Sequence, residues 1–101
     1  NAQGLTQVNL SIANLPHTDT LVAYAWKLKG DIYYHLDDVE KFESSYAKAI
    51  FLNPNEPSIY YGRAFDYGGF KQHEKAIADI NKVLELDEGN IRARDLLATI
   101  Y

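Results

Sequence analysis

The sequence predicts an all-α fold, a solenoid of about six helices arranged in antiparallel pairs. Apolar residues recur with helical spacing, proline and glycine signals separate the helical segments at short intervals, and the chain resembles itself after a shift of 34 residues. No alternating strand pattern competes with the helical one anywhere in the sequence. Because the connections are short, consecutive helices are expected to be antiparallel neighbours.

Length and charge limit the classes of partner. The chain has 101 residues, 47% of them hydrophobic, which is the size of one domain. Its 10 basic and 14 acidic residues argue against binding to nucleic acid or anionic lipid. Apolar runs long enough to span a bilayer are missing from the sequence, so we expect a soluble chain without membrane insertion, with the cytoplasm as the default compartment. It begins at Asn1, so we expect a processed chain or a fragment.

The first two predicted helices flank Pro16. Apolar residues at positions 5, 8, 12 and 15 follow one helical face, and Pro16 ends that run. Residues 18 to 20 then offer N-cap oxygens before a second helix from about Thr20 to His35. The segment 1–22 is therefore a preceding helix with its linker.

The next two helices are delimited by acidic caps and prolines. Asp37, followed three residues later by Glu40, has the pattern of a capping box that starts a third helix. This helix is expected to end at Asn53, because a residue before proline is disfavoured in the α region. Pro57 suits the first position of a fourth helix, and Gly68-Gly69 should loosen its end.

The last two helices are predicted from about His73 to Leu86 and from Ile91 to Tyr101. Gly89 separates them, and Asn90 offers an N-cap for the second. The fifth helix is amphipathic. Its inward face should carry Ala76, Ile80, Val83 and Leu84, and its outward face Asp79, Asn81, Lys82 and Glu85.

The internal repeat links these helices into units. A shift of 34 residues places Tyr33 on Tyr67, Glu40 on Glu74, Lys41 on Lys75, Lys48 on Lys82 and Leu52 on Leu86. Other aligned pairs keep their size and character, such as Trp26 with Tyr60 and Ala49 with Val83. A helix-turn-helix unit of this period resembles the tetratricopeptide repeat (TPR). The resemblance covers residues 23–101 and implies a right-handed superhelix.

The resemblance divides the single domain into repeat 1 at 23–56, repeat 2 at 57–90, and a first or capping helix of a third unit at 91–101. Three positions depart from the family pattern. Phe42 stands where a small alanine is usual, so we expect looser or shifted packing in repeat 1. Glu88 replaces a proline, and Lys71 replaces a glycine or other small residue at a turn.

In this family the first helix of each pair lines a concave groove, and the resemblance carries that role over to eleven positions. They are Tyr24, Lys27, Asp31, Tyr34, Ser58, Tyr61, Phe65, Gly68, Arg92, Asp95 and Thr99. Helical spacing agrees, since Lys27 and Asp31, like Tyr61 and Phe65, are separated by four residues. The alternative is that the aromatic residues of this set only pack on neighbouring helices.

The resemblance implies a non-enzymatic protein–protein interaction module that binds a peptide or protein segment in this groove. The alternative is a structural segment of a longer repeat array, or a module that self-associates through its end helices. One subtype grips the C-terminal carboxylate of chaperone tails. Lys27 and Arg92 match its pattern, but Asp31, Gly62 and Leu96 do not, which argues against that ligand.

Catalytic or metal chemistry finds little support in the sequence. The three histidines, His17, His35 and His73, are far apart, and none forms a metal-spaced pair with another histidine. The sequence contains neither cysteine nor a glycine-rich phosphate loop. We therefore expect no cofactor, no metal and no enzymatic activity.

Overall fold

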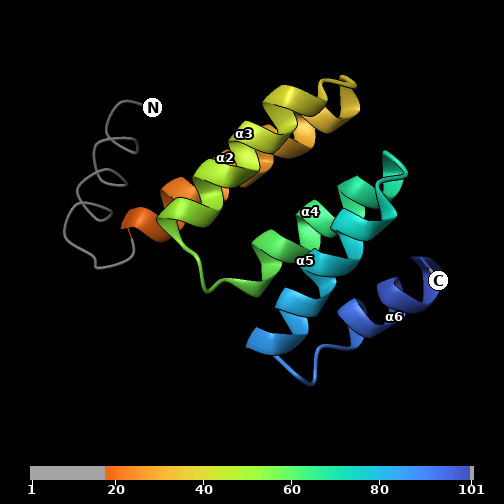
Figure 1. Cartoon of the computed structure of the whole chain (residues 1–101). Helices are drawn as coiled ribbons and strands as arrows, with labels where there is room; N and C mark the ends of the chain where they lie inside the picture. Colours follow the sequence, from red (N-terminus) through yellow and green to blue (C-terminus); the bar gives the residue numbers. More distant parts are fainter. Residues whose placement is uncertain (1–17, 101) are drawn as a thin grey trace, which may run out of the picture.

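The computed structural model describes residues 18–100, and this part of the chain consists of helices joined by short connections (Figure 1). The helices are α2 (Thr18–His35), α3 (Val39–Leu52), α4 (Pro57–Gly69), α5 (His73–Leu86) and α6 (Ile91–Ile100). The helix predicted near residues 5–15 and the final Tyr101 lie outside the described residues. Between residues 18 and 100 the structure has no strand, which confirms the all-α, TPR-like solenoid.

The helices follow one another as antiparallel hairpins. α2 packs mainly on α3 and α4 mainly on α5, while α6 follows on the far side of α5 (Figure 1). α4 also contacts α2, α3 and α6, so it touches every other helix of the described residues. This arrangement places α2 and α4, the first helices of the two pairs, next to each other.

The connection between α2 and α3 corrects one sequence prediction. Asp38, not Asp37, is the N-cap of α3, and its carboxylate accepts a hydrogen bond from the Lys41 backbone N–H at 3.1 Å. Asp37 instead has a φ of 59° in the left-handed region. It closes the preceding turn by donating its N–H to the Tyr34 carbonyl. The N-cap of α3 therefore lies one residue later in the sequence than predicted.

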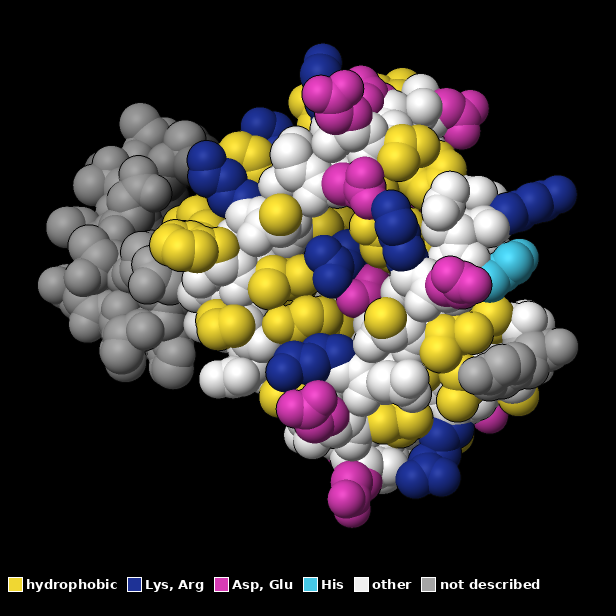
Figure 2. Space-filling view, in the orientation of Figure 1, with side chains coloured by type: hydrophobic (Ala, Val, Ile, Leu, Met, Phe, Trp, Pro, Cys, Tyr) yellow, Lys and Arg dark blue, Asp and Glu magenta, His cyan; other side chains and the backbone are white. Residues whose placement is uncertain are grey.

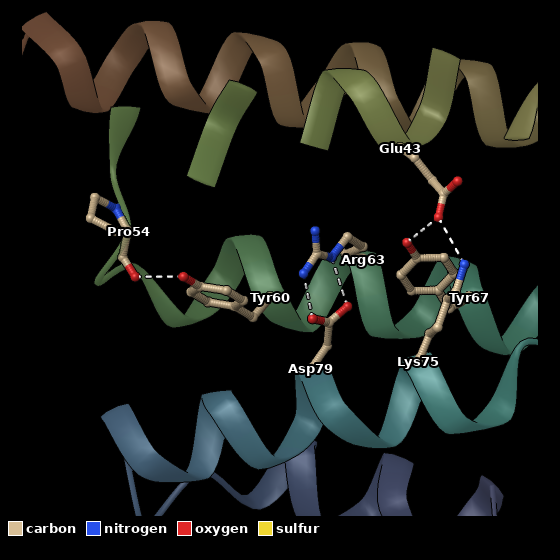
Figure 3. A network of polar contacts seen from close by, with 7 residues as sticks. All are labelled: Glu43, Pro54, Tyr60, Arg63, Tyr67, Lys75 and Asp79. Carbon is tan, nitrogen blue, oxygen red and sulfur yellow. Dashed lines mark hydrogen bonds and ion pairs between the residues drawn. The ribbon is translucent and has the colours of Figure 1, made fainter. Parts of the chain in front are cut away.

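The two prolines between α3 and α4 act as predicted. Pro57 occupies the first turn of α4, after the N-cap Glu56, whose carboxylate accepts from the Ser58 N–H at 3.2 Å. The Tyr60 hydroxyl donates to the Pro54 carbonyl at 2.7 Å, so α4 is tied back to this joint (Figure 3). Lys71, in the turn after α4, has a φ of 63°, which explains why glycine is favoured at that position.

An aromatic cluster centred on Phe42 forms the core between the two hairpins. Phe42 is completely buried, and its ring makes edge-to-face contacts with Tyr46, Tyr67 and Phe70 at centroid distances of 5.1–5.2 Å. The ring thus fills the junction between α3 and α4 instead of loosening the first unit. Gly30 lets α2 and α3 approach closely, because a Cβ there would lie 2.5 Å from the Tyr46 ring.

Candidate functional site

An open groove of about 560 Å³ lies between α2 and α4 and reaches the first turn of α6. Its lining residues come from three helices. They are Tyr24, Lys27, Asp31, Tyr34 and His35 from α2, Ser58, Tyr61, Gly62, Phe65 and Asp66 from α4, and Arg92 from α6. Because α2 and α4 are held side by side by the hairpin packing, the groove is a consequence of the fold and not of a loop.

The structure brings eight of the eleven predicted groove residues together in this groove. Gly68, Asp95 and Thr99 do not line it; the Thr99 hydroxyl donates to the Asp95 carbonyl along α6, and both residues are exposed. Three lining residues were missed by the sequence prediction, namely His35, Gly62 and Asp66. The sequence offered only a weak signal for these three residues. Gly62 and Asp66 are four residues apart, which places them on one face of their helix.

The walls of the groove are aromatic. Tyr24 is 52% exposed and Phe65 56% exposed, so about half of each residue is not covered by packing within the described residues. Tyr34 is different, because its ring packs edge-on against Phe70 at 5.0 Å. Tyr61 is half-buried against the core. The alternative, in which the aromatic residues serve only to pack neighbouring helices, therefore fits Tyr34 best. It fits the exposed Tyr24 and Phe65 least.

The floor of the groove is polar and begins with Asp31. One of its oxygens accepts a hydrogen bond from the Tyr46 hydroxyl of α3, and the other lies 3.3 Å from the Lys27 ammonium. The same ammonium lies over the Tyr24 ring, 5.9 Å from its centroid. Burial raises the pKa of Asp31, but hydrogen bonds from Asp66, Tyr46 and Lys27 outweigh burial and lower it overall. Asp31 is therefore ionised in the folded protein.

Asp66 completes the floor as the protonated member of a carboxyl pair. It is only 4% exposed, and burial together with the neighbouring Asp31 charge raises its pKa to about 8. At neutral pH Asp66 is therefore mainly a carboxylic acid that donates to Asp31. Gly62 makes room for this network, because a Cβ there would meet the Tyr46 hydroxyl at 2.7 Å and Lys27 Cε at 2.8 Å.

Two further polar networks, away from the groove, hold α4 in place (Figure 3). Arg63 of α4 forms two hydrogen bonds with the Asp79 carboxylate of α5, at 2.8 and 2.7 Å. The prediction that Asp79 lies on the outward face of α5 is wrong, because its side chain is buried against Arg63. A helical pattern could not predict this partner, because Arg63 belongs to another helix.

The second network joins α4 and α5 to α3. Glu43 accepts hydrogen bonds from the Tyr67 hydroxyl at 2.7 Å and the Lys75 ammonium at 3.2 Å (Figure 3). The bond from Tyr67 is the main cause that lowers the pKa of Glu43, and the bond from Lys75 adds to it. Both networks anchor α4, the helix whose Tyr61 and Phe65 line the groove.

Charges of both signs are mixed on the face of the molecule shown in Figure 2. The face in Figure 2 carries Lys and Arg beside Asp and Glu, interspersed with hydrophobic side chains, without a field of one sign. Between residues 18 and 100 no cluster of three or more His, Asp or Glu could hold a metal ion. In the same range, no helix is both long and apolar enough to cross a membrane.

Comparison with known proteins agrees with the repeat architecture. The tetratricopeptide repeat model matches residues 23–56 and 57–90. The chain is also similar to the TPR repeat-containing protein MJ1428 of Methanocaldococcus jannaschii, with 40% identity over 77 residues. That alignment covers 71% of this chain and 14% of the relative, so the chain spans only a small part of the relative's length.

Tetratricopeptide repeats are in general protein-interaction modules, and the family is in general non-enzymatic. The two matched repeats cover most of the chain, and the hairpins of the structure have the corresponding architecture. The resemblance derived from the sequence is thereby confirmed, and the chain belongs to the tetratricopeptide repeat family.

Proposed function

We propose that this chain binds a peptide or protein segment in the groove between α2, α4 and α6, and that it does so without catalysing a reaction. The observation that carries the proposal is the pair of exposed aromatic side chains, Tyr24 and Phe65, on opposite walls of the groove. Exposed aromatic residues beside a polar floor offer both apolar burial and hydrogen bonding to a ligand. The division of the chain into a leading segment, two repeats and a terminal helix is part of this proposal.

In the proposed complex, Tyr24, Tyr61 and Phe65 bury apolar parts of the segment. Aromatic anchors of this kind carry most of the binding energy in protein interfaces, about 2 kcal/mol or more for each one that becomes fully buried. Arg92 lies at the α6 end of the groove and is exposed, so it is free to meet an acidic group of the partner. Lys27 is held by Asp31 and contributes less.

The double substitution Tyr61→Ala and Phe65→Ala is expected to abolish binding of the native partner, because it removes both aromatic side chains of the α4 wall of the groove. Phe65 is exposed and Tyr61 is half-buried, so the fold should persist. The measurement is quantitative capture of proteins from the native lysate, with circular dichroism as the test of folding.

The matched control is Phe51→Ala, because Phe51 is 84% exposed but does not line the groove. This variant should capture the same proteins as the unaltered chain. If the double variant retains every protein that the unaltered chain captures, the groove is not the binding site and the proposal falls.

Self-association through α6 is a second candidate function. Ile91 is 72% exposed, and Leu96, Leu97 and Ile100 are only partly buried where α6 packs on the core. Apolar residues left exposed on a helix of a solenoid favour a further layer of the same kind. If α6 serves this purpose, the mass measured by light scattering increases with protein concentration, and Ile91→Lys abolishes the increase. A constant monomer mass would exclude this function.

A further inference from the structure

Among the described residues that line the groove, one buried carboxyl oxygen receives no hydrogen bond from the fold. Asp66 is 4% exposed, and its Oδ2 atom accepts no hydrogen bond from the described residues, although the side chain lines the groove. A buried polar atom without a partner costs about 1–3 kcal/mol, and more when it is charged. Asp66 therefore needs either a proton of its own or a donor from a ligand.

In the free protein the proton fills this need. The titratable and charged groups that face Asp66 are Asp31 and Lys27 from α2 and Tyr46 from α3. A protonated Asp66 can donate to Asp31, while Tyr46 donates to the same carboxylate and Lys27 neutralises its charge. The floor is then electrically neutral, because it holds one carboxylate, one ammonium and one carboxylic acid.

A ligand cation can take the place of that proton. If Asp66 loses its proton, the floor carries one uncompensated negative charge in a largely buried position. A ligand that brings one positive charge restores neutrality and supplies the donor that Asp66 Oδ2 lacks. An acidic ligand group would face two carboxyl groups there, with Lys27 already committed to Asp31.

The walls of the groove suit such a cation. The rings of Tyr24, Tyr61 and Phe65 can enclose the aliphatic stem of a long basic side chain and stabilise its head by cation–π attraction. The chain itself contains an example, since the Lys27 ammonium lies between the Tyr24 ring at 5.9 Å and Asp31 at 3.3 Å. The groove volume of about 560 Å³ leaves room for a second side chain.

We propose that Asp66, Asp31 and the aromatic walls form a subsite for a lysine or arginine side chain of the bound segment, whose head donates to Asp66 Oδ2 in place of the proton shared by the two carboxyls. This inference rests on the proposed function and specifies the class of partner: a segment with a basic residue among apolar neighbours.

The exchange of the Asp66 proton for a ligand cation makes the binding affinity depend on pH. The direction of this dependence follows from the number of protons released on binding. Binding the cation releases one proton from Asp66, whose pKa in the free protein is about 8. Below that value, affinity rises by up to about tenfold for each pH unit, because more of the protein has already lost the proton. Above it, affinity no longer changes. His35 is a second titratable group on the groove wall, so the pH series is repeated on His35→Gln.

The test uses a random dodecapeptide library as the probe. Peptides are selected on the unaltered chain near pH 8 and counter-selected on the Tyr61→Ala, Phe65→Ala variant, so that only groove-dependent peptides remain. We expect these peptides to share a lysine or arginine. Replacing it by norleucine or citrulline should weaken binding to the unaltered chain at least about tenfold, the value of one lost ion pair. It should have little effect on binding to Asp66→Asn, which keeps the shape of the side chain.

The outcomes separate the inference from the function on which it rests. Groove-dependent peptides that lack a basic residue, or that bind Asp66→Asn as tightly as the unaltered chain, overturn the cation subsite and leave the groove proposal standing. If no groove-dependent peptide emerges, the proposed function itself is overturned, and the subsite with it. A tenfold gain in affinity between about pH 6 and pH 7 that is lost in Asp66→Asn supports the exchange of proton for cation.

Discussion

Replacing Asp79 by alanine is expected to lower the free energy of unfolding by about 3–5 kcal/mol, because it leaves the partly buried Arg63 guanidinium without its partner. The Arg63 side chain is 22% exposed and the Asp79 side chain 6% exposed. They form two hydrogen bonds between α4 and α5. Burial lowers the pKa of Arg63, but its hydrogen bonds to Asp79 outweigh burial and raise it overall, so the arginine stays charged in either case. Urea denaturation followed by circular dichroism measures the loss.

Two further variants identify the cause of that loss. Asp79→Asn keeps the volume and one acceptor but removes the charge, so it should lose less stability than Asp79→Ala. The double variant Arg63→Met, Asp79→Leu removes both charges and should recover most of the stability, because an apolar pair of similar volume often replaces a buried ion pair without loss. A loss below about 1 kcal/mol for Asp79→Ala would instead place the pair among exposed ion pairs.

The same contact bears on the function. Arg63 lies on α4 between Tyr61 and Phe65 in sequence, so its bond to Asp79 helps to fix the rotation of α4 about its axis. That rotation determines which α4 side chains face the groove. Partner binding should therefore weaken in Asp79→Ala even at temperatures where the variant is still folded.

The helices were predictable because their ends depend on local chemistry. Pro57 at the start of α4 and the residue before Pro54 at the end of α3 act within one or two residues of the chain, and the structure agrees with both. The cap of α3 shows the limit of such local rules. With two adjacent aspartates available, the turn geometry placed Asp37 in the left-handed region and left Asp38 as the cap.

Only those residues of the candidate site that the 34-residue repeat aligns with known groove positions could be predicted from the sequence. The register places Tyr24, Tyr61 and Phe65 on the first helix of each pair, and these residues line the groove. It does not identify polar residues that are buried by a partner distant in sequence. Asp66 interacts with Asp31 of another helix, and Asp79 with Arg63. A hydrophobic pattern assigns both aspartates to solvent, because it contains no information on such partners.

Phe42→Ala is expected to lower the free energy of unfolding by about 3–5 kcal/mol, the range for removing a buried phenylalanine ring. Although alanine is the usual family residue at this position, the neighbours in this chain are arranged around a ring. Phe42 contacts Tyr46, Tyr67 and Phe70 edge-to-face, and it is completely buried. These large side chains cannot close the space that alanine would leave, so a cavity remains between the two hairpins.

Thermal and urea denaturation of a short series measure this effect. Phe42→Leu keeps most of the volume and should cost less than Phe42→Ala, while Phe51→Ala removes the same ring from an 84% exposed position and should cost little. A loss below about 1 kcal/mol for Phe42→Ala would mean that the hairpins close around the smaller residue, as expected for a typical repeat. The effect should also reach the groove, because Tyr46 packs on Phe42 through its ring and binds Asp31 through its hydroxyl. Loss of the Phe42 ring therefore frees the residue that supports the groove floor, and peptide binding should weaken together with stability.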